Sequence, residues 1–269
     1  MTMNKIEVVN DSIISQNIDD TIKLNVIEKN DFFNVTILEF TILKNTILEI
    51  DYQSNEKTKL EIIFHVNENV SFSLFEKRYN EKAKVRYKYH LMKNSVTNVF
   101  KFENVDFVKE MTHIYLKEEG ATINYYLKAL TKTLNDFDYV IYHEASKTSS
   151  NLSLNSVAFK EGECHITTSG FVPNKKEECT LNHNSRIIKL NDLFSFIKPN
   201  LFIDEYNVIA NHSAHIGQFN KEDLFYLQSR GISYEDSLYL LIKGFLNIPL
   251  KEFSYFEEEL EKNINQYWR

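Results

Sequence analysis

The chain contains very little glycine and proline. It has 6 Gly and 3 Pro in 269 residues, about 3% together against about 12% in average proteins. So little glycine excludes the Gly-rich loops that hold phosphates in nucleotide-binding proteins. Tight turns must use other residues, and Asn, with 29 positions, tolerates left-handed backbone geometry best among the non-glycine residues. We therefore expect Asn at many of the turns.

Basic clusters and long apolar runs are also missing. The net charge is −7 and no stripe of Lys and Arg occurs, which excludes a sequence-independent grip on nucleic acid. The longest apolar runs, such as 238–242, are far shorter than the ~20 residues of a membrane span. The N-terminus has no signal-peptide core, so we expect a cytoplasmic protein. In that reducing compartment, Cys164 and Cys179 are not expected to form a disulfide.

Apolar and polar residues alternate with period two from about residue 20 to residue 218, as in 22–26. Turn clusters such as 67–69 separate these stretches, and the pattern predicts many short strands. We assign 1–218 to one all-β core, in which 1–20 can be irregular. A sandwich, a barrel and a β-solenoid would all give this spacing, and periodicity does not choose among them.

The segment 219–269 has the helical pattern instead, because its apolar residues recur every three or four positions. Asn220 is a predicted N-cap and Gly231 a predicted left-handed C-terminal cap. We expect the helices to pack on the end of the β core. The three predicted helices cover about 221–229, Ser233 to near Gly244, and the segment that Pro249 opens.

Few residues form a recognisable chemical site. Cys164 and His165, with Cys179 and His183, offer zinc-ligand types, but an adjacent pair points to opposite faces of a strand, which does not suit a zinc site. His212, with a second His three residues later, is a candidate for metal binding or proton transfer. Hydrolase triads and metalloprotease motifs do not occur. The residues alone therefore indicate no catalytic centre.

Several motifs resemble, in order and spacing, the SufB/SufD family of scaffold subunits in Suf iron–sulfur cluster assembly. The resemblance covers about 57–248 and is most specific in the LFYLQSRG block that follows a His-containing turn. The motifs are LKEEGA (116–121), DYVIYHEASKTS (138–149), KPNLFI (198–203), VIANHSAHIGQ (208–218), LFYLQSRGI (224–232) and LIKGF (241–245).

The resemblance implies a right-handed parallel β-helix with a C-terminal bundle of about three α-helices. It also implies two partners: a SufB-like paralogue that pairs through the β-helix, and a SufC-type ABC ATPase that docks on the C-terminal helices. Pairing between two copies of this chain is left open. The expected ATPase-binding residues are Phe225, Tyr226, Arg230, Leu241 and Phe245, which could instead be helix–helix core.

Within the family, the chain is more similar to the SufD side. Gly217 and Gln218 follow the D-type pattern, and His212 matches the histidine that D-type members supply where the cluster forms. His183 falls near the position of a B-type cysteine, and Ala210 stands where D-type members often have a cysteine. The resemblance thus implies a transient iron–sulfur cluster at a subunit interface with His212 as a ligand, since such clusters accept His in place of Cys. Flavin binding by the complex is left open.

We therefore expect a SufD-like scaffold subunit without catalytic turnover of its own. The chain is expected to lack the family's N-terminal helical region. One alternative is a β-helix enzyme that acts on polysaccharide, which would need an acidic groove or calcium ligands. Another is an interaction protein of the same fold without cluster chemistry, which Ala210 and the small number of cysteines favour.

Overall fold

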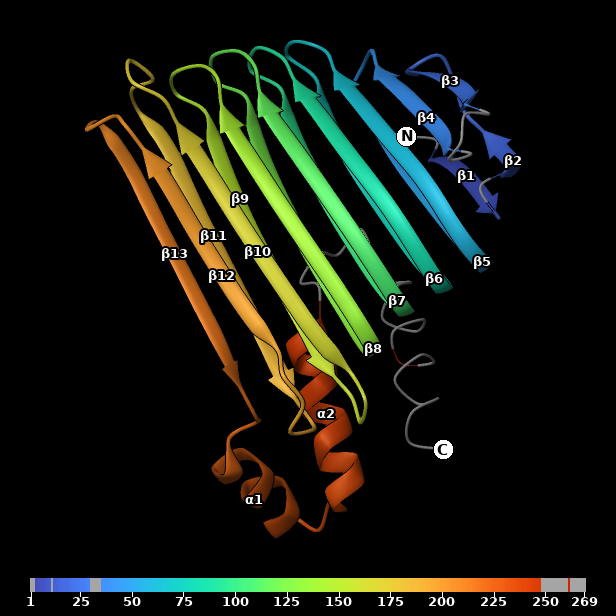
Figure 1. Ribbon diagram of the computed structural model, residues 1–269, viewed down its shortest axis with the longest axis vertical. Helices are drawn as coiled ribbons and strands as arrows, with labels where there is room; N and C mark the ends of the chain where they lie inside the picture. The colour runs from blue at the N-terminus through green and yellow to red at the C-terminus, as the bar shows by residue number, and fades with distance from the viewer. Residues whose placement is uncertain (1–2, 11, 30–34, 248–260, 262–269) are drawn as a thin grey trace.

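The computed structural model of the chain describes residues 3–10, 12–29, 35–247 and 261. The described strands form one 13-stranded sheet that winds into a parallel β-solenoid, and the helices α1 and α2 follow it (Figure 1). The elements are β1 (Asn4–Val9), β2 (Ser12–Asn17), β3 (Ile22–Lys29), β4 (Val35–Ile42), β5 (Thr46–Val66), β6 (Ser71–Leu91), β7 (Val96–Leu116), β8 (Thr122–His143), β9 (Ser149–Ala158), β10 (Glu163–Val172), β11 (Cys179–Lys189), β12 (Phe196–Ile203), β13 (Val208–Gly217), α1 (Lys221–Ser229) and α2 (Tyr234–Leu246).

The central rungs of the solenoid are single long strands. β5 to β8 have 21 or 22 residues each and pair in parallel along their whole length. The first half of β8 pairs with β9 and the second half with β10, so each rung crosses two faces of the coil. The expected parallel β-helix is confirmed. The expectation of short strands was wrong for these four rungs, because register shifts inside the strand, such as that between Val105 and Phe107, accommodate the bend without a break.

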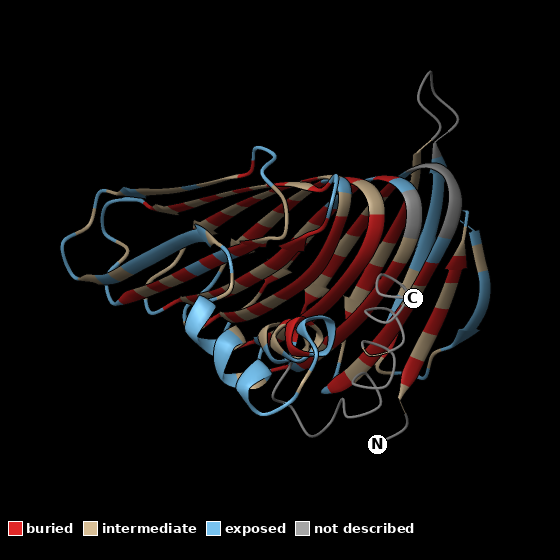
Figure 2. Ribbon diagram, turned by 90° about the horizontal axis from the view of Figure 1, so that it is seen from below, coloured by how far each residue is buried: buried red, intermediate tan, exposed pale blue. Residues whose placement is uncertain are grey.

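Buried residues alternate with more exposed ones along the strands (Figure 2), and the buried residues of neighbouring rungs lie in register. One such row is Leu48, Leu74, Val99, Tyr125 and Leu152, neighbours in register and all buried. Burying a large apolar side chain contributes about 1.5–3 kcal/mol. The period-two pattern of the sequence is therefore the main source of stability of the solenoid.

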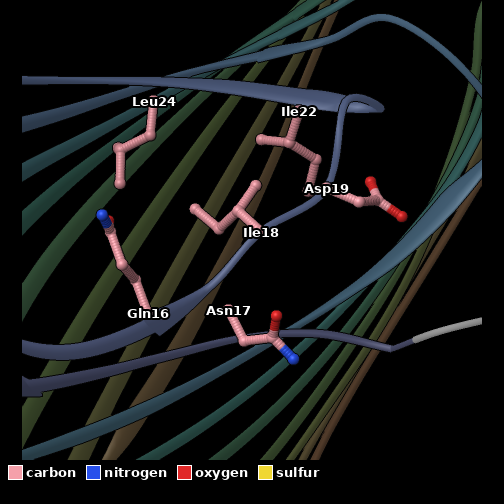
Figure 3. A pocket seen from close by; sticks show the side chains of 6 residues that line it. All are labelled: Gln16, Asn17, Ile18, Asp19, Ile22 and Leu24. Carbon is pink, nitrogen blue, oxygen red and sulfur yellow. The ribbon is translucent and has the colours of Figure 1, made fainter.

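Two strands precede the first one that the pattern predicts near residue 20. β1 joins the parallel sheet beside β5, while β2 and β3 pair antiparallel with β1 and β4 and cover the N-terminal end of the coil. An open hollow of about 340 Å³ lies beside this cap (Figure 3). Among the described residues that line it, one is charged: Asp19, whose carboxylate accepts a hydrogen bond from the Thr21 amide at 2.9 Å. The lining residues are Gln16, Asn17, Ile18, Asp19, Ile22 and Leu24.

One corner of the solenoid has left-handed backbone geometry in successive rungs. The residues with positive φ there are Asn69, Asn94, Gly120, Lys147 and Glu178. The backbone amides of all but Gly120 donate a hydrogen bond to a carbonyl of the next rung. Asn thus occupies this corner in two of the rungs, as expected. Other Asn residues form a ladder on the outer surface. The side-chain NH₂ group of each donates a hydrogen bond to the side-chain oxygen of the Asn in the preceding rung, at 2.9–3.1 Å. The ladder consists of Asn98, Asn124, Asn151, Asn182 and Asn211.

Replacing Gly120 with Ala should lower the free energy of unfolding by about 1–3 kcal/mol. The φ of Gly120 is +78°, and an added Cβ would lie 2.3 Å from Oδ1 of Asn94. Urea denaturation measures the change. The matched control is Gly244→Ala, since a Cβ at Gly244 meets no atom within 4 Å and Ala is the better helix former. If the two variants were equally stable, the strain at this corner would be disproved.

The two described helices begin as the sequence predicts. Asn220 caps α1 by accepting from the Glu222 amide at 3.1 Å, and Gly231, with φ of +85°, follows its end. The hydroxyl of Ser233 accepts from the Asp236 amide at 3.1 Å at the start of α2.

The predicted end of α2 near Gly244 was two residues early. The helix continues to Leu246, because this side chain is buried against the outer surface of the solenoid. The third predicted helix, from Pro249, lies outside the described residues. Within the described part of the chain, no helix has the length and apolarity needed to span a membrane.

Candidate functional site at the C-terminal end of the solenoid

The last rung places His212 at an open edge. β13 pairs with β11 on one side, and no strand of the described residues pairs with its other side. His212 lies in register with His183, which lies in register with Leu152. The inward row therefore changes from apolar side chains to imidazoles as it reaches the end of the coil. His183 is 1% exposed, whereas His212 is exposed because nothing among the described strands stacks on it.

A hydrogen-bonded chain of buried polar groups lies behind His183. Its Nε2 hydrogen-bonds the Ser150 hydroxyl at 3.0 Å, and the same hydroxyl hydrogen-bonds His143 Nε2 at 3.0 Å. His143 Nδ1 reaches Thr148 Oγ1 at 2.8 Å. His183 Nδ1 is buried and has no hydrogen-bond partner among the described residues. Space for the ring is left by Gly170, where an added Cβ would lie 3.2 Å from His183 Cε1.

Both buried imidazoles are uncharged at neutral pH. Burial lowers the pKa of His183 to about 4, and the nearby His212 lowers it further. Burial likewise lowers the pKa of His143 to about 3, with His183 as the second cause. A neutral imidazole has a free nitrogen lone pair, which is the form that binds metals. The geometry therefore gives the open end of the solenoid one exposed imidazole backed by a neutral, buried one.

The cysteines do not join this site as zinc ligands. Cys179 Sγ lies 3.3 Å from Thr148 Oγ1, and Cys164 is buried on β10 beside Asn135 of β8. Both are free thiols, as expected, and burial raises the pKa of Cys164 to about 12. Across the residues that the structure describes, no three His, Cys, Asp or Glu side chains are grouped to hold a metal ion.

The neighbours of His212 on β13 are fixed by the rung beneath. Asn211 donates to Asn182 at 3.1 Å, and Ser213 donates to Asn184 at 2.8 Å. Ala210 packs against the small core cluster that includes Leu181. β13 is therefore held on one side by backbone pairing and polar side chains, which fixes the position of His212 on the open edge.

The predicted ATPase-binding residues separate into two groups. On α1, where no residue is buried, Phe225 is 74% exposed and Tyr226 58% exposed. The Arg230 guanidinium lies 5.3 Å from the Tyr226 ring centroid. On α2, Leu241 and Phe245 are half-buried, and Phe245 packs against the outer surface of the solenoid. α1 is thus an exposed aromatic surface, whereas Phe245 contributes to the fold.

The sequence analysis missed the buried partners of His183. Ser150 and His143 lie 33 and 40 positions before it, and no local spacing connects residues that only the coil brings together. A signal was nevertheless present, since His143 and Ser150 each continue the inward positions of an alternating strand.

A family model and several curated proteins are similar to this chain. A family model described as "SUF system FeS cluster assembly, SufBD core domain" matches residues 25–245. Iron-sulfur cluster assembly protein SufD of Bacillus subtilis is 29% identical over 109 residues, which are 40% of this chain and 22% of that protein. A SufBD family protein of Mycobacterium leprae is 37% identical over 67 residues, 24% of this chain and 17% of that protein. Another, from Pyrococcus horikoshii, is 44% identical over 55 residues, 20% of this chain and 12% of that protein.

The alignments with these relatives span less than a quarter of the relatives' own lengths. The family model, by contrast, matches most of the chain. Since the match extends from β3 to α2, it includes most of the solenoid and both described helices. The chain belongs to the SufBD family of Suf iron–sulfur cluster assembly proteins.

Proposed function

We propose that the chain is a SufD-like scaffold subunit of cytoplasmic iron–sulfur cluster assembly, without catalytic turnover of its own. His212 is the residue that contacts the nascent cluster, which is the cargo of the complex. The observation that supports this most strongly is the exposed position of His212 on the last rung, directly beside the neutral imidazole of His183. Iron–sulfur clusters accept imidazole in place of thiolate.

The open edge of β13 supports pairing with a SufB-like subunit. An edge strand presents unpaired N–H and C=O groups that bind a strand of another chain. Ile209 and Ile216 on this strand are 62% and 40% exposed, so apolar surface accompanies the open backbone groups. The described residues hold no three-ligand group, and the partner must therefore supply further ligands. A complex of two copies of this chain would contradict heterodimer formation.

The exposed aromatic surface of α1 supports docking of a SufC-type ATPase. Aromatic and Arg side chains carry most of the binding free energy in protein interfaces, and Phe225, Tyr226 and Arg230 combine both types on one short helix. α2 contacts the solenoid through Leu238, Ile242 and other side chains, so movement of the docked ATPase would be transmitted to the β core.

Replacing Phe225 and Tyr226 with Ala should weaken binding of the ATPase about 30-fold or more, since interface hot spots contribute about 2 kcal/mol or more. Isothermal titration calorimetry with the SufC-type protein measures the affinity. Leu240→Ala is the control, because Leu240 is exposed on α2 and is not among the predicted contacts. Unchanged affinity in the double variant would contradict docking on α1.

A second candidate is an interaction protein of the same fold that has lost cluster chemistry. Ala210, at a position where D-type members often have a cysteine, and the lack of a three-ligand group among the described residues both favour it. Co-expression with a SufB-like protein and the ATPase distinguishes these two candidate functions. A complex that contains iron and sulfide supports the scaffold, and a complex without them supports the interaction protein.

A polysaccharide-active enzyme is not supported. Such an enzyme needs carboxylates in an open groove, whereas Glu76, Glu103 and Glu110 point into the coil and are completely buried.

A further inference from the structure

Five charged side chains lie inside the solenoid, where a β-helix normally holds apolar residues. We name them the interior charge cluster: Glu76 and Arg78 on β6, and Lys101, Glu103 and Glu110 on β7. All five side chains are 0% exposed. Three carboxylates face two cations, so the fully ionised cluster would carry one excess negative charge. Burial without compensation strongly disfavours such a charge.

Glu110 is well stabilised as an anion. It accepts a hydrogen bond from the Lys101 ammonium group and another from the Thr112 hydroxyl at 2.9 Å. The Tyr125 and Tyr139 hydroxyls donate to it at 3.4 and 3.3 Å. Burial acts to raise the pKa of Glu110, but the charges of Lys101 and Arg78 and the hydrogen bonds from Lys101 and Thr112 together hold this pKa below its usual value. Glu110 is therefore not the carboxylate that must take up a proton to remove the excess negative charge of the cluster.

Glu76 is also satisfied on one oxygen. Its Oε1 accepts from Arg78 Nη2 at 2.6 Å and from the Tyr87 hydroxyl. Glu76 and Glu110 therefore match the two cations of the cluster.

Glu103 is the carboxylate of the cluster that lacks such hydrogen bonds. Lys101 Nζ lies 3.2 Å and Arg78 Nη1 3.8 Å from its Oε1, yet neither oxygen accepts a hydrogen bond from any described residue. Burial raises the pKa of Glu103 to about 7, although Arg78 and Lys101 act to lower it. The negative charges of Glu110 and Glu76 also raise it.

Four tyrosines and the arginine at the cluster do not exchange protons near neutral pH. Burial raises the pKa of each of the tyrosines Tyr87, Tyr89, Tyr125 and Tyr139 well above its ordinary value. The pKa of Arg78 is raised as well, because the attraction of the carboxylates and Tyr87 exceeds the effect of burial. Glu103 interacts with Arg78, Lys101, Glu110 and Glu76. The tyrosines that face the cluster, among the described residues, are Tyr52 on β5, Tyr87 and Tyr89 on β6, and Tyr125 and Tyr139 on β8.

We propose that the interior of the solenoid is a binding site for one exchangeable proton, held by Glu103, which the folded chain releases as the pH rises through neutrality. The unfolded chain releases the same proton at a lower pH, near the ordinary value of 4.5 for Glu. Stability from this proton is therefore complete below about pH 4.5 and is lost as the pH rises through about 7. Within this window the unfolding equilibrium constant rises up to about tenfold per pH unit.

Urea denaturation of the full chain between pH 5 and 8 tests this proposal, with Glu103→Gln as the variant. Gln keeps the shape of the protonated side chain, so its stability should lack this pH dependence. Between pH 5 and 7 the unfolding constant of the wild type, relative to that of Glu103→Gln, should rise about 40-fold, because the slope falls below tenfold per pH unit near each of the two pKa values. Glu68→Gln, at an exposed turn, should follow the wild type. A ratio of wild type to Glu103→Gln that stays constant with pH would overturn the proposal.

Infrared spectroscopy of the folded wild type gives a second test if Glu103→Gln does not fold. A protonated carboxyl group has its own carbonyl band, which should be present at pH 5.5 and disappear as the pH rises through about 7, in the range of the raised pKa. Absence of this band at every pH where the protein is folded would overturn the proposal.

Discussion

Replacing Lys101 with Met is expected to lower the free energy of unfolding by about 3–5 kcal/mol at pH 7, because it leaves buried carboxylates without their cation. The Lys101 ammonium group bonds Glu110, lies 3.2 Å from Glu103 and lies 3.7 Å from the ring centroid of Tyr87. Met fills a similar volume but carries no charge. Urea denaturation followed by circular dichroism measures the loss, which should decrease toward pH 5 as the carboxylates take up protons.

The control is the same substitution at a surface ion pair. Lys117 Nζ lies 3.0 Å from Glu144, and the two side chains are 35% and 37% exposed. Exposed pairs contribute about 0–1 kcal/mol, so Lys117→Met should change stability by less than about 1 kcal/mol. If Lys101→Met were no more harmful than Lys117→Met, charge compensation would not be what holds the interior charge cluster together.

Replacing Phe102 with Ala should lower the free energy of unfolding by about 3–5 kcal/mol, the usual cost of such a cavity. Phe102 is 0% exposed and belongs to the cluster that joins the outer surface of the solenoid to Leu238, Ile242 and Leu246 of α2. Thermal and urea denaturation measure the effect, and loss of helical signal before strand signal would show that α2 detaches first.

Phe225→Ala is the matched control for this substitution. Because Phe225 is 74% exposed on α1, its loss should change stability by no more than about 0.5 kcal/mol. A similar loss of stability in both variants would mean that Phe225 belongs to the folded core and is unavailable for a partner.

The alternation of apolar and polar residues was sufficient to predict an all-β core, but not its architecture. A sandwich and a solenoid bury alternate residues in the same way, so only the motifs between 116 and 245 selected the solenoid. The bends inside β5 to β8 escaped detection for a physical reason. They are made within continuous strands, with register shifts in β5 and β7. Polar residues near the bends, such as Asn104 and Asn135, are typical of turns and so predict breaks between strands that the structure does not have.

The sequence analysis did not predict the interior charge cluster. Yet Glu76 and Arg78 continue the inward positions of Phe72 and Leu74 on the same strand, so strict alternation already placed them inside. The sequence could not show which cation compensates the buried charge of Glu76, because only the register of neighbouring rungs brings Lys101 beside it.

The glycines in the family-like motifs do not all lie at turns or helix ends. Gly120 and Gly231 have the positive φ expected of a turn and a helix end. Gly217 and Gly244 do not. Gly217 ends β13 close to the His215 ring, and Gly244 lies within α2. Local motifs indicated where a chain reversal was expected, but packing of Leu246 decided where the helix ended.

The role of His212 is tested most directly by the iron and acid-labile sulfide content of the complex that the chain forms with a SufB-like protein and a SufC-type ATPase. Wild type, His212→Ala and His215→Ala should be compared at equal subunit stoichiometry, since both histidines are exposed on β13. We expect His212→Ala to lose most of the iron and sulfide and His215→Ala to keep them. Wild-type iron and sulfide content in the His212→Ala complex would contradict the proposed function of this site.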